Sequence, residues 1–378
     1  MGERGVRISI VCDVMANLEG SARPAICLAE GLKERGWDVS LVSPAMLGDV
    51  EEELSSMGIT PVNLGARLFS KDADPSLLWI EGWSREAFLG LNSRLAGKDE
   101  TLSLNFSHMV SVPSLAWYLQ GPPSKALEDI SCELPWYLSL AHRVVKPLLR
   151  WADGRLIRVM SSSSRLVVAN SRFCASMYSG WGLNIDHVIY PPINLQAFHP
   201  SPNPSSDYVL TYFGKETIYS VVKNIADGGV KIKAFGSKTQ LLASSFKKRL
   251  LSHPNVEFLG RVTSKKLVEL YSNALFTLFP FTHEPFGYIP LESMACGVPV
   301  LTFGFQGPGE YVVDGHTGWL TLTREEMVKR ALEVWREGYP RQMSLNCVKE
   351  AAKFDERRYM ERWMGLLEAI LNSSPRRR

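Results

Sequence analysis

Little in this 378-residue sequence points to a metal site, a disulfide framework or a membrane span. The six cysteines are scattered, without CxxC spacing or clustered histidines, which excludes a recognisable zinc motif and favours reduced thiols. No stretch approaches the roughly 18 apolar residues of a membrane-spanning helix. Residues 1–10 contain no apolar region long enough for a signal peptide. We therefore expect a cytoplasmic protein without a metal.

Charge and glycine patterns argue against two further classes of protein. The net charge is only +3, well short of the surplus that indicates nucleic-acid binding, so we expect no nucleic-acid partner. Neither half of the chain has a GxGxxG turn after its first predicted strand, which makes a dinucleotide-dependent dehydrogenase a poor fit.

The sequence does contain enough apolar residues, 45% of the total, for two ordinary cores. Its opening predicts a βαβ unit, with a strand over 6–12, a helix over 22–35 and a strand over 38–42. Ser21 is a candidate N-cap and Gly36 is placed to end the helix. The fold class indicated is α/β.

The second half alternates apolar, β-prone runs with helical segments at intervals of 20 to 25 residues. This rhythm is typical of a doubly wound parallel sheet, because each parallel strand needs a crossover helix. The predicted strands lie at about 208–213, 230–235, 256–259, 275–281 and 298–303.

Five prolines between Tyr190 and Ser206 mark a boundary, since they cannot continue a helix or a central strand. We predict a first domain over 1–190, a linker over 191–206 and a second domain over 207–354. Beyond residue 323 the pattern predicts helices to about residue 371. Residues 373–378 form a basic tail that we expect to fray.

Two carboxylates, Glu284 and Glu292, flank a glycine-containing turn after the apolar run 275–281. That run predicts a buried strand of a parallel sheet, and ligands of such sheets bind at the carboxyl ends of the strands. One carboxylate can accept hydrogen bonds from a sugar hydroxyl and the other from a ribose hydroxyl, with phosphates between them. The alternative is a pair of solvated charges beside a helix.

The segment from His283 to Val300 resembles the E-x7-E signature of retaining GT-B glycosyltransferases of family four. The likeness continues through 307–320, and 167–173 with 188–194 is similar to the passage between the two domains of that family. It is nearest to the asparagine-linked-glycan mannosyltransferases. The resemblance implies two Rossmann-like, doubly wound domains facing a cleft, with a last helix, 355–372, returning to the first domain.

The resemblance also implies an activity. It is the transfer of a hexose from a GDP- or UDP-linked donor to an acceptor hydroxyl, with retention of configuration and no cofactor beyond the nucleotide-sugar co-substrate. Glu284 would hold sugar hydroxyls near the reacting carbon, and Glu292 would hold the ribose. Two alternatives remain open: a same-fold nucleotide-sugar epimerase or hydrolase, and a non-catalytic nucleotide-sugar-binding protein.

The chain departs from the family where cations are expected to bind the diphosphate. Lys215 stands at the position of the family's arginine, and Ser220 stands where a lysine is expected. The nearest later cation is Lys223, for which a solvated position on a helix face is the alternative. A lysine can bind phosphate but lacks the bidentate fork of arginine. Backbone N–H groups at the start of the following helix would supply the remaining donors without a metal. They belong to Phe286, Gly287 and Tyr288.

Three further features are candidates for the site. Gly20 and Ser21, before the first helix, are implied by the resemblance to approach phosphate or acceptor, with a tight turn as the alternative. His108 follows a strand-like run where family members often carry a histidine that contacts the donor sugar, although a lone histidine is usually structural. Glu310 can bond to sugar or loop backbone, or match a helix dipole.

Residues 135–165 interleave apolar side chains with six cations against one acid, Asp153. A basic helix with tryptophans can lie on an anionic membrane, whereas the alternative is a pair of core helices whose cations reach solvent. With the segment 117–123, this region suggests a lipid-linked or other glycan acceptor and a peripheral position on the inner membrane face. The six cations are Arg143, Lys146, Arg150, Arg155, Arg158 and Arg165.

Overall fold

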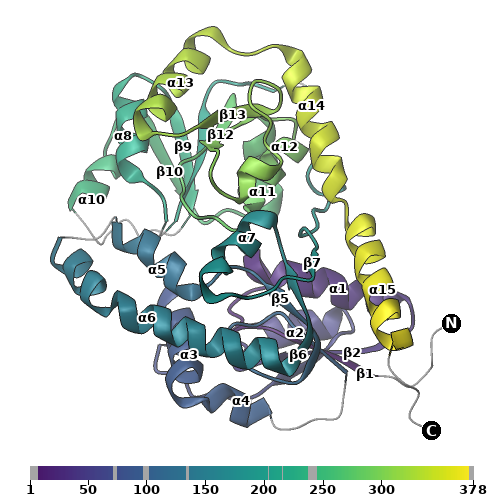
Figure 1. Ribbon diagram of the computed structural model, residues 1–378. Coiled ribbons are helices and arrows are strands. Elements are labelled where there is room, and N and C mark those ends of the chain that lie inside the picture. The colour runs from purple at the N-terminus through teal and green to yellow at the C-terminus, as the bar shows by residue number, and fades with distance from the viewer. Residues whose placement is uncertain are drawn as a thin grey trace, which may run out of the picture. The chain divides into compact units, whose positions relative to one another are not determined.

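The computed structural model describes residues 7–70, 75–96, 102–132, 136–202, 204–214, 216–236 and 245–373. Contacts divide the chain into two units (Figure 1). The first comprises the chain up to Ser124, Val145–Pro192 and the segment from Glu356 onward; the second comprises Lys125–Val144 and Ile193–Asp355. One division falls inside the proline-rich stretch 190–206. Residues 125–144, which the sequence analysis includes in the first domain, group with the second unit.

Among the described residues, the first unit contains a seven-stranded sheet in the order β3-β2-β1-β4-β5-β6-β7. Every neighbouring pair is parallel. The order reverses between β1 and β4, which makes this the point where a doubly wound sheet opens for a ligand. The strands are β1 (Arg7–Val11), β2 (Asp38–Ser43), β3 (Thr60–Asn63), β4 (Leu102–Asn105), β5 (Ser114–Leu119), β6 (Ser164–Ala169) and β7 (His187–Val188).

Helices connect these strands, and the βαβ opening is confirmed. Gly36, at φ +84°, ends the first helix as expected. The expected N-cap is wrong: a short 3-10 turn, Gly20–Ala22, precedes the helix, so that Ala22 takes the cap position and no side chain caps it. The helices before the linker are α1 (Arg23–Glu34), α2 (Val50–Ser56), α3 (Pro75–Leu89), α4 (Leu91–Ala96), α5 (Pro123–Cys132), α6 (Trp136–Ser163) and α7 (Arg172–Met177).

The last helix, α15 (Glu356–Ser373), returns to the first unit, as the resemblance implies. It lies beside α1 in Figure 1 and contributes Trp363 and Leu367 to the core beneath the sheet. The Tyr359 hydroxyl donates to the Pro24 carbonyl at 2.8 Å. A Cβ on Gly31 would lie 2.5 Å from Met360, so glycine permits the close approach of the two helices.

The second unit contains, among its described residues, a six-stranded parallel sheet in the order β10-β9-β8-β11-β12-β13. Its order reverses between β8 and β11. The strands are β8 (Val209–Phe213), β9 (Ile232–Gly236), β10 (Val256–Gly260), β11 (Phe276–Phe279), β12 (Val300–Phe303) and β13 (Gly318–Thr321). Five of them confirm the predicted strands, while β13 was not predicted.

Helices complete this second doubly wound unit, and its core is built from the fully buried strands β11 and β12 together with α8. The helices are α8 (Tyr219–Asp227), α10 (Ser245–Leu251), α11 (Ser264–Ser272), α12 (Tyr288–Ala295), α13 (Arg324–Glu337) and α14 (Arg341–Ala351), with 3-10 turns at Gly307–Glu310 and Ala352–Phe354. Within the described ranges, no helix combines the length and apolarity needed to cross a bilayer.

Candidate functional site

The loops that follow β8 and β11 meet where the strand order of the second sheet reverses. The Ile218 N–H, in the loop after β8, donates to the Pro280 carbonyl, in the loop after β11, at 3.0 Å. Thr217 fixes the first loop, since its hydroxyl accepts from the Gly214 N–H and donates to the Tyr212 carbonyl, both at 2.9 Å. This edge of the sheet is where a doubly wound unit binds its ligand.

Glu284 lies in the loop between β11 and α12, and its backbone is held on both sides by the turn after β12. The Gly307 N–H donates to the Glu284 carbonyl at 2.8 Å, and the Glu284 N–H donates to Gln306 Oε1 at 3.3 Å. Gln306 is itself buried and donates to the Thr302 hydroxyl at 2.8 Å. Glu284 is half-buried, and these hydrogen bonds fix the position of its backbone.

Two glycines make this corner sterically feasible. A Cβ on Gly307 would lie 2.3 Å from the Pro285 carbonyl oxygen, a distance that no side chain can occupy. Gly287 has φ +89°, and its Cβ would lie 2.8 Å from Pro308. The same Cβ would lie 3.3 Å from Glu284 Cγ. The glycines therefore bring Glu284, Gly287 and the turn that contains Glu310 together.

Tyr311 ties the corner to the start of α12 and was missed by the sequence analysis. Its buried hydroxyl donates to the carbonyls of Phe286, at 3.1 Å, and Gly287, at 2.5 Å. Burial raises the pKa of this phenol well above its ordinary value. The negative charges of three nearby carboxylates raise it further, those of Glu284, Glu292 and Glu310. The sequence signal that could have identified Tyr311 is an aromatic residue that closely follows a Gly-Pro-Gly turn.

The amino end of α12 differs from the expectation by one or two residues. The helix begins at Tyr288 with Gly287 as its N-cap, so Phe286 lies before the helix. Phe286 is 2% exposed and packs against Tyr311 with ring centroids 5.6 Å apart. Pro290, in the first turn, has no N–H. The first turn therefore offers fewer backbone donors to an anion than the sequence analysis assumed.

Glu292 lies inside α12, as predicted, but only 3% of it is exposed. Its Oε2 accepts a hydrogen bond from the Tyr271 hydroxyl of α11 at 3.0 Å. A buried carboxylate needs such partners because desolvation is costly. Contact of Glu292 with a ribose stays a prediction, and Tyr271 is the residue that a ribose hydroxyl would have to join or replace.

The structure describes one of the two cations that were predicted to bind the diphosphate. Lys215 lies outside the described residues. Lys223 forms an ion pair with Asp227, one turn along α8, at 2.6 Å, and Asp227 also contacts His253 at 3.2 Å. This arrangement matches the alternative of a solvated helix face. Arg324, at the start of α13, instead reaches Ser220 at 3.5 Å. A guanidinium therefore contacts the position where the family resemblance leads one to expect a lysine.

The first unit contains its own polar cluster where its strand order reverses, centred on Asp13, just beyond β1. The carboxylate accepts from the Ser107 hydroxyl at 2.6 Å and from the His108 backbone N–H at 2.7 Å. Burial alone would raise the pKa of Asp13, but the hydrogen bonds and charge of His108, with the Ser107 hydroxyl, hold it below its ordinary value. The sequence analysis did not identify Asp13, although a polar residue just past a first strand was visible.

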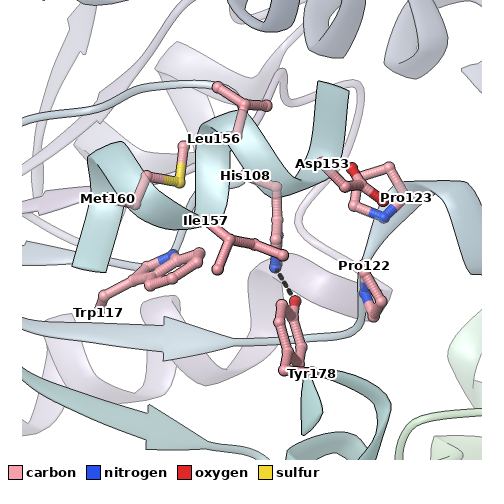
Figure 2. Close-up of a pocket in the computed structure, with 9 residues that line it drawn as sticks. All are labelled: His108, Trp117, Pro122, Pro123, Asp153, Leu156, Ile157, Met160 and Tyr178. Carbon is pink, nitrogen blue, oxygen red and sulfur yellow. Dashed lines mark hydrogen bonds between the residues drawn. The ribbon is translucent and has the colours of Figure 1, made fainter. Parts of the chain in front are cut away.

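His108 is 6% exposed and lies three residues past β4. Figure 2 shows its ring directed at Tyr178, with a 2.9 Å hydrogen bond between Nε2 and the hydroxyl. Burial raises the pKa of Tyr178 well above its ordinary value, so the phenol keeps its proton. The other ring nitrogen of His108, Nδ1, is 3.9 Å from the Asp13 carboxylate. Both nitrogens thus face protein groups, and contact with a sugar stays a prediction.

Gly20 and Ser21 are exposed, and Gly20 has φ +60°. Ser21 lines a pocket at the carboxyl end of the first sheet together with Asp13, Trp79 and Gln120. His108 lines a different, smaller pocket, beneath α6, with Asp153 and Trp117 (Figure 2). Asp13 links the two pockets: it lines the first pocket with Ser21, and it accepts a hydrogen bond from His108, which lines the second. Within the described chain, no group of three or more potential metal ligands is found.

The two parallel-sheet units define a protein of the GT-B architecture, and comparison with solved structures agrees. Sucrose-phosphate synthase from Thermosynechococcus elongatus superposes with a TM-score of 0.70. The superposition covers 98% of this chain and 100% of that one, at 16% identity. At this identity the likeness concerns the fold.

The sequence of the second unit is similar to known glycosyltransferases. Residues 216–354 match the family described as "Glycosyl transferases group 1". An uncharacterized glycosyltransferase of Methanocaldococcus jannaschii is 31% identical over 107 residues, 28% of this chain and 30% of that protein. The alpha-1,3/1,6-mannosyltransferase alg2 of Schizosaccharomyces pombe is 46% identical over 66 residues, 18% of this chain and 13% of that protein. The matches span less than a third of either relative.

Proposed function

We propose that this protein is a retaining glycosyltransferase that moves a hexose from a nucleotide diphosphate sugar to an acceptor hydroxyl. The observation that carries the proposal is the corner at Glu284, which stands where the strand order of the second sheet reverses, within the stretch that matches the glycosyltransferase family. A half-buried carboxylate on a backbone fixed by glycines can accept hydrogen bonds from sugar hydroxyls with little reorganisation.

The leaving diphosphate needs positive charge, because a dianion develops as the bond to the anomeric carbon breaks. We assign this role to Lys215, to Arg324 beside Ser220, and to the N–H groups at the start of α12. Glu292 would receive the ribose, and Glu310 lies in the turn that supports the corner. The reaction proposed uses no metal and no cofactor beyond the co-substrate.

On the acceptor side, we propose the first unit, with the Gly20–Ser21 loop, Asp13 and His108 around the carboxyl end of its sheet. The proposed acceptor is a glycan. If this glycan is linked to a lipid, the protein would reach it by peripheral contact with the cytoplasmic side of an anionic membrane.

A thermal-shift panel of GDP-, UDP- and ADP-linked hexoses tests donor binding. The true donor, present at about 100 times its Kd, should stabilise the folded state by about 2.7 kcal/mol. The same hexose linked to one of the other two nucleotides should not stabilise it. Stabilisation by none of them would contradict the proposal.

Product analysis by mass spectrometry then separates the alternatives. Transfer that depends on an added acceptor supports the glycosyltransferase. Free sugar or an epimer formed at full rate without acceptor would identify a hydrolase or epimerase, and tight donor binding without turnover over a broad acceptor panel would identify a binding protein.

A further inference from the structure

Helix α6 has two apolar faces, of which the protein buries only one. The inner face contributes Leu156, Ile157 and Met160 to the pocket under His108 (Figure 2), and each is at most 6% exposed. The opposite face carries, within the first unit, three large apolar side chains at helical spacings of three and eight residues. We call it the outer face; it consists of Leu148 (51% exposed), Trp151 (52%) and Val159 (45%).

The end of α3 extends this apolar surface. Phe88 and Leu89 are 38% and 57% exposed, and Phe88 stacks on Trp151 with ring centroids 6.4 Å apart. Arg155, in the gap of the outer face between Trp151 and Val159, donates to the last carbonyls of α3, to Ala87 at 2.6 Å and to Phe88 at 3.3 Å. The two helices therefore present a single preformed surface rather than separate mobile side chains.

The charge around the outer face has one sign. Arg150 and Arg158 are exposed on the part of α6 that belongs to the first unit. Asp153 is the only acid of this helix within the described residues, and it is 1% exposed and turned to the inner side, where it accepts from the Ser124 N–H at 2.8 Å. An exposed apolar stripe with flanking arginines is the pattern of a helix that lies in a lipid–water interface.

We propose that the outer face of α6, with Phe88 and Leu89, docks the protein onto an anionic lipid bilayer. The apolar side chains would enter the boundary between headgroups and acyl chains, while the arginines pair with lipid phosphates. A second copy of this chain is a poorer occupant, because a two-fold interface would bring the same arginines face to face. The inference deepens the proposed function by bringing the protein to lipid-linked acceptors, but docking itself requires no donor and no turnover.

Flotation of the full chain with vesicles tests the docking. We expect binding to vesicles of phosphatidylcholine with phosphatidylglycerol, little binding to phosphatidylcholine alone, and release at 1 M salt, where the screening length falls to about 3 Å. The variant R150Q/R158Q should bind roughly 25-fold more weakly, since each arginine near the surface contributes roughly fivefold.

The apolar component has its own variant and control. The double variant Leu148→Glu with Val159→Glu should weaken vesicle binding by at least about tenfold, because two carboxylates would have to enter the interface. The matched control is Leu345→Glu, which alters an equally exposed leucine on α14 of the second unit and should bind like the unaltered protein. Unchanged melting temperature and unchanged stabilisation by the donor would show that the double variant is folded and that the donor site is intact.

Two outcomes would overturn the inference. One is equal binding of the double variant and the Leu345→Glu control to anionic vesicles. The other is a dimer in sedimentation velocity that the double variant converts to monomer, which would make the outer face a contact between copies. Neither outcome bears on sugar transfer to a soluble acceptor, so failure of docking and failure of the proposed function are distinguishable.

Discussion

The two sheets share one strand order around their reversal points, yet they organise those points by different means. In the first unit the centre is a side chain: the Asp13 carboxylate accepts from the Ser107 hydroxyl and the His108 N–H, and the His108 ring is bonded to Tyr178. In the second unit the bonds hold backbone atoms: the Gly307 N–H donates to the Glu284 carbonyl, and glycines allow the chain segments to approach. The side chains of Thr217, Gln306 and Tyr311 each bond to backbone atoms there.

The difference indicates how each site should respond to change. A network of side-chain hydrogen bonds contains titratable groups, so it should depend on pH and tolerate isosteric replacement at a moderate cost. A corner of closely packed backbone has no room for a methyl group, and the carboxylate that it presents can be removed without disturbing its support. Four predictions test this contrast, from the largest expected effect to the smallest.

Glu284→Ala should lower the rate of sugar transfer by on the order of 1000-fold, about 4 kcal/mol of transition-state stabilisation. The melting temperature should change little, because the backbone of residue 284 is what the turn holds. Steady-state kinetics and thermal unfolding measure the two effects. Glu269→Ala, at an exposed site on α11, is the matched control, and turnover equal to that of the control would remove Glu284 from the mechanism.

Gly307→Ala should destabilise the second unit by about 2–3 kcal/mol, because the new methyl group would meet the Pro285 carbonyl oxygen at 2.3 Å. Denaturant unfolding measures this loss. Gly365→Ala on α15 is the control: no atom lies within 4 Å of its Cβ position, and in a helix the change should stabilise by up to about 1 kcal/mol. Equal stability of the two variants would show that the corner is not tightly packed.

Asp13→Asn should make the stability of the first unit less dependent on pH. The folded-state pKa of Asp13 is lowered, so its ionised form stabilises the fold above the unfolded-state value of about 4, and this stability is lost as the pH falls through the lower folded-state pKa. The variant should therefore be less stable at pH 7 by about 1–2 kcal/mol, with the difference shrinking below about pH 4.

Unfolding at a series of pH values measures the Asp13 effect. The control is Asp49→Asn, at an exposed aspartate of the same unit, which should follow the unaltered protein throughout. A stability difference for Asp13→Asn that is constant from pH 3 to pH 7 would mean that the charge of Asp13 has no role in the network.

Tyr178→Phe should have the smallest effect, about 1 kcal/mol, since the ring keeps its contact with Trp117, whose centroid is 6.2 Å away, and the change removes only the hydroxyl that bonds to His108. The readout specific to the network is the His108 imidazole in nitrogen-detected NMR. Loss of the phenolic hydroxyl should shift the Nε2 resonance. An unchanged resonance would contradict the hydrogen bond between the two side chains.

Much of the fold could be predicted from local pattern. Apolar runs gave five strands of the second sheet, and the proline-rich stretch 190–206 contains a division between the units. β13 escaped prediction because it begins at Gly318, whose Cβ would lie 2.2 Å from the Val300 carbonyl oxygen. That glycine reflects a contact with another strand, which no local pattern contains.

The candidate site was predicted less completely, and the two glutamates show why. Both positions were visible in the sequence, and Glu284 lies in the expected loop. That Glu292 is almost fully enclosed and bonded to Tyr271 depends on how α11 packs against α12. Lys223 forms an ion pair with Asp227, one turn further along α8. The four-residue spacing in the sequence permits this pair but does not show that it forms.

By itself, the sequence determined the opening βαβ unit, five strands of the second sheet and the place of Glu284 in the loop after residues 275–281, because periodicity, proline and glycine act on the chain locally. Only the tertiary structure decided that Asp13, His108 and Tyr178 form one network, since these residues are 95 and 70 positions apart. It likewise decided that α6 buries one apolar face and exposes the other. Burial and hydrogen bonding depend on which distant segments pack together, and that information is not present in any single stretch of chain.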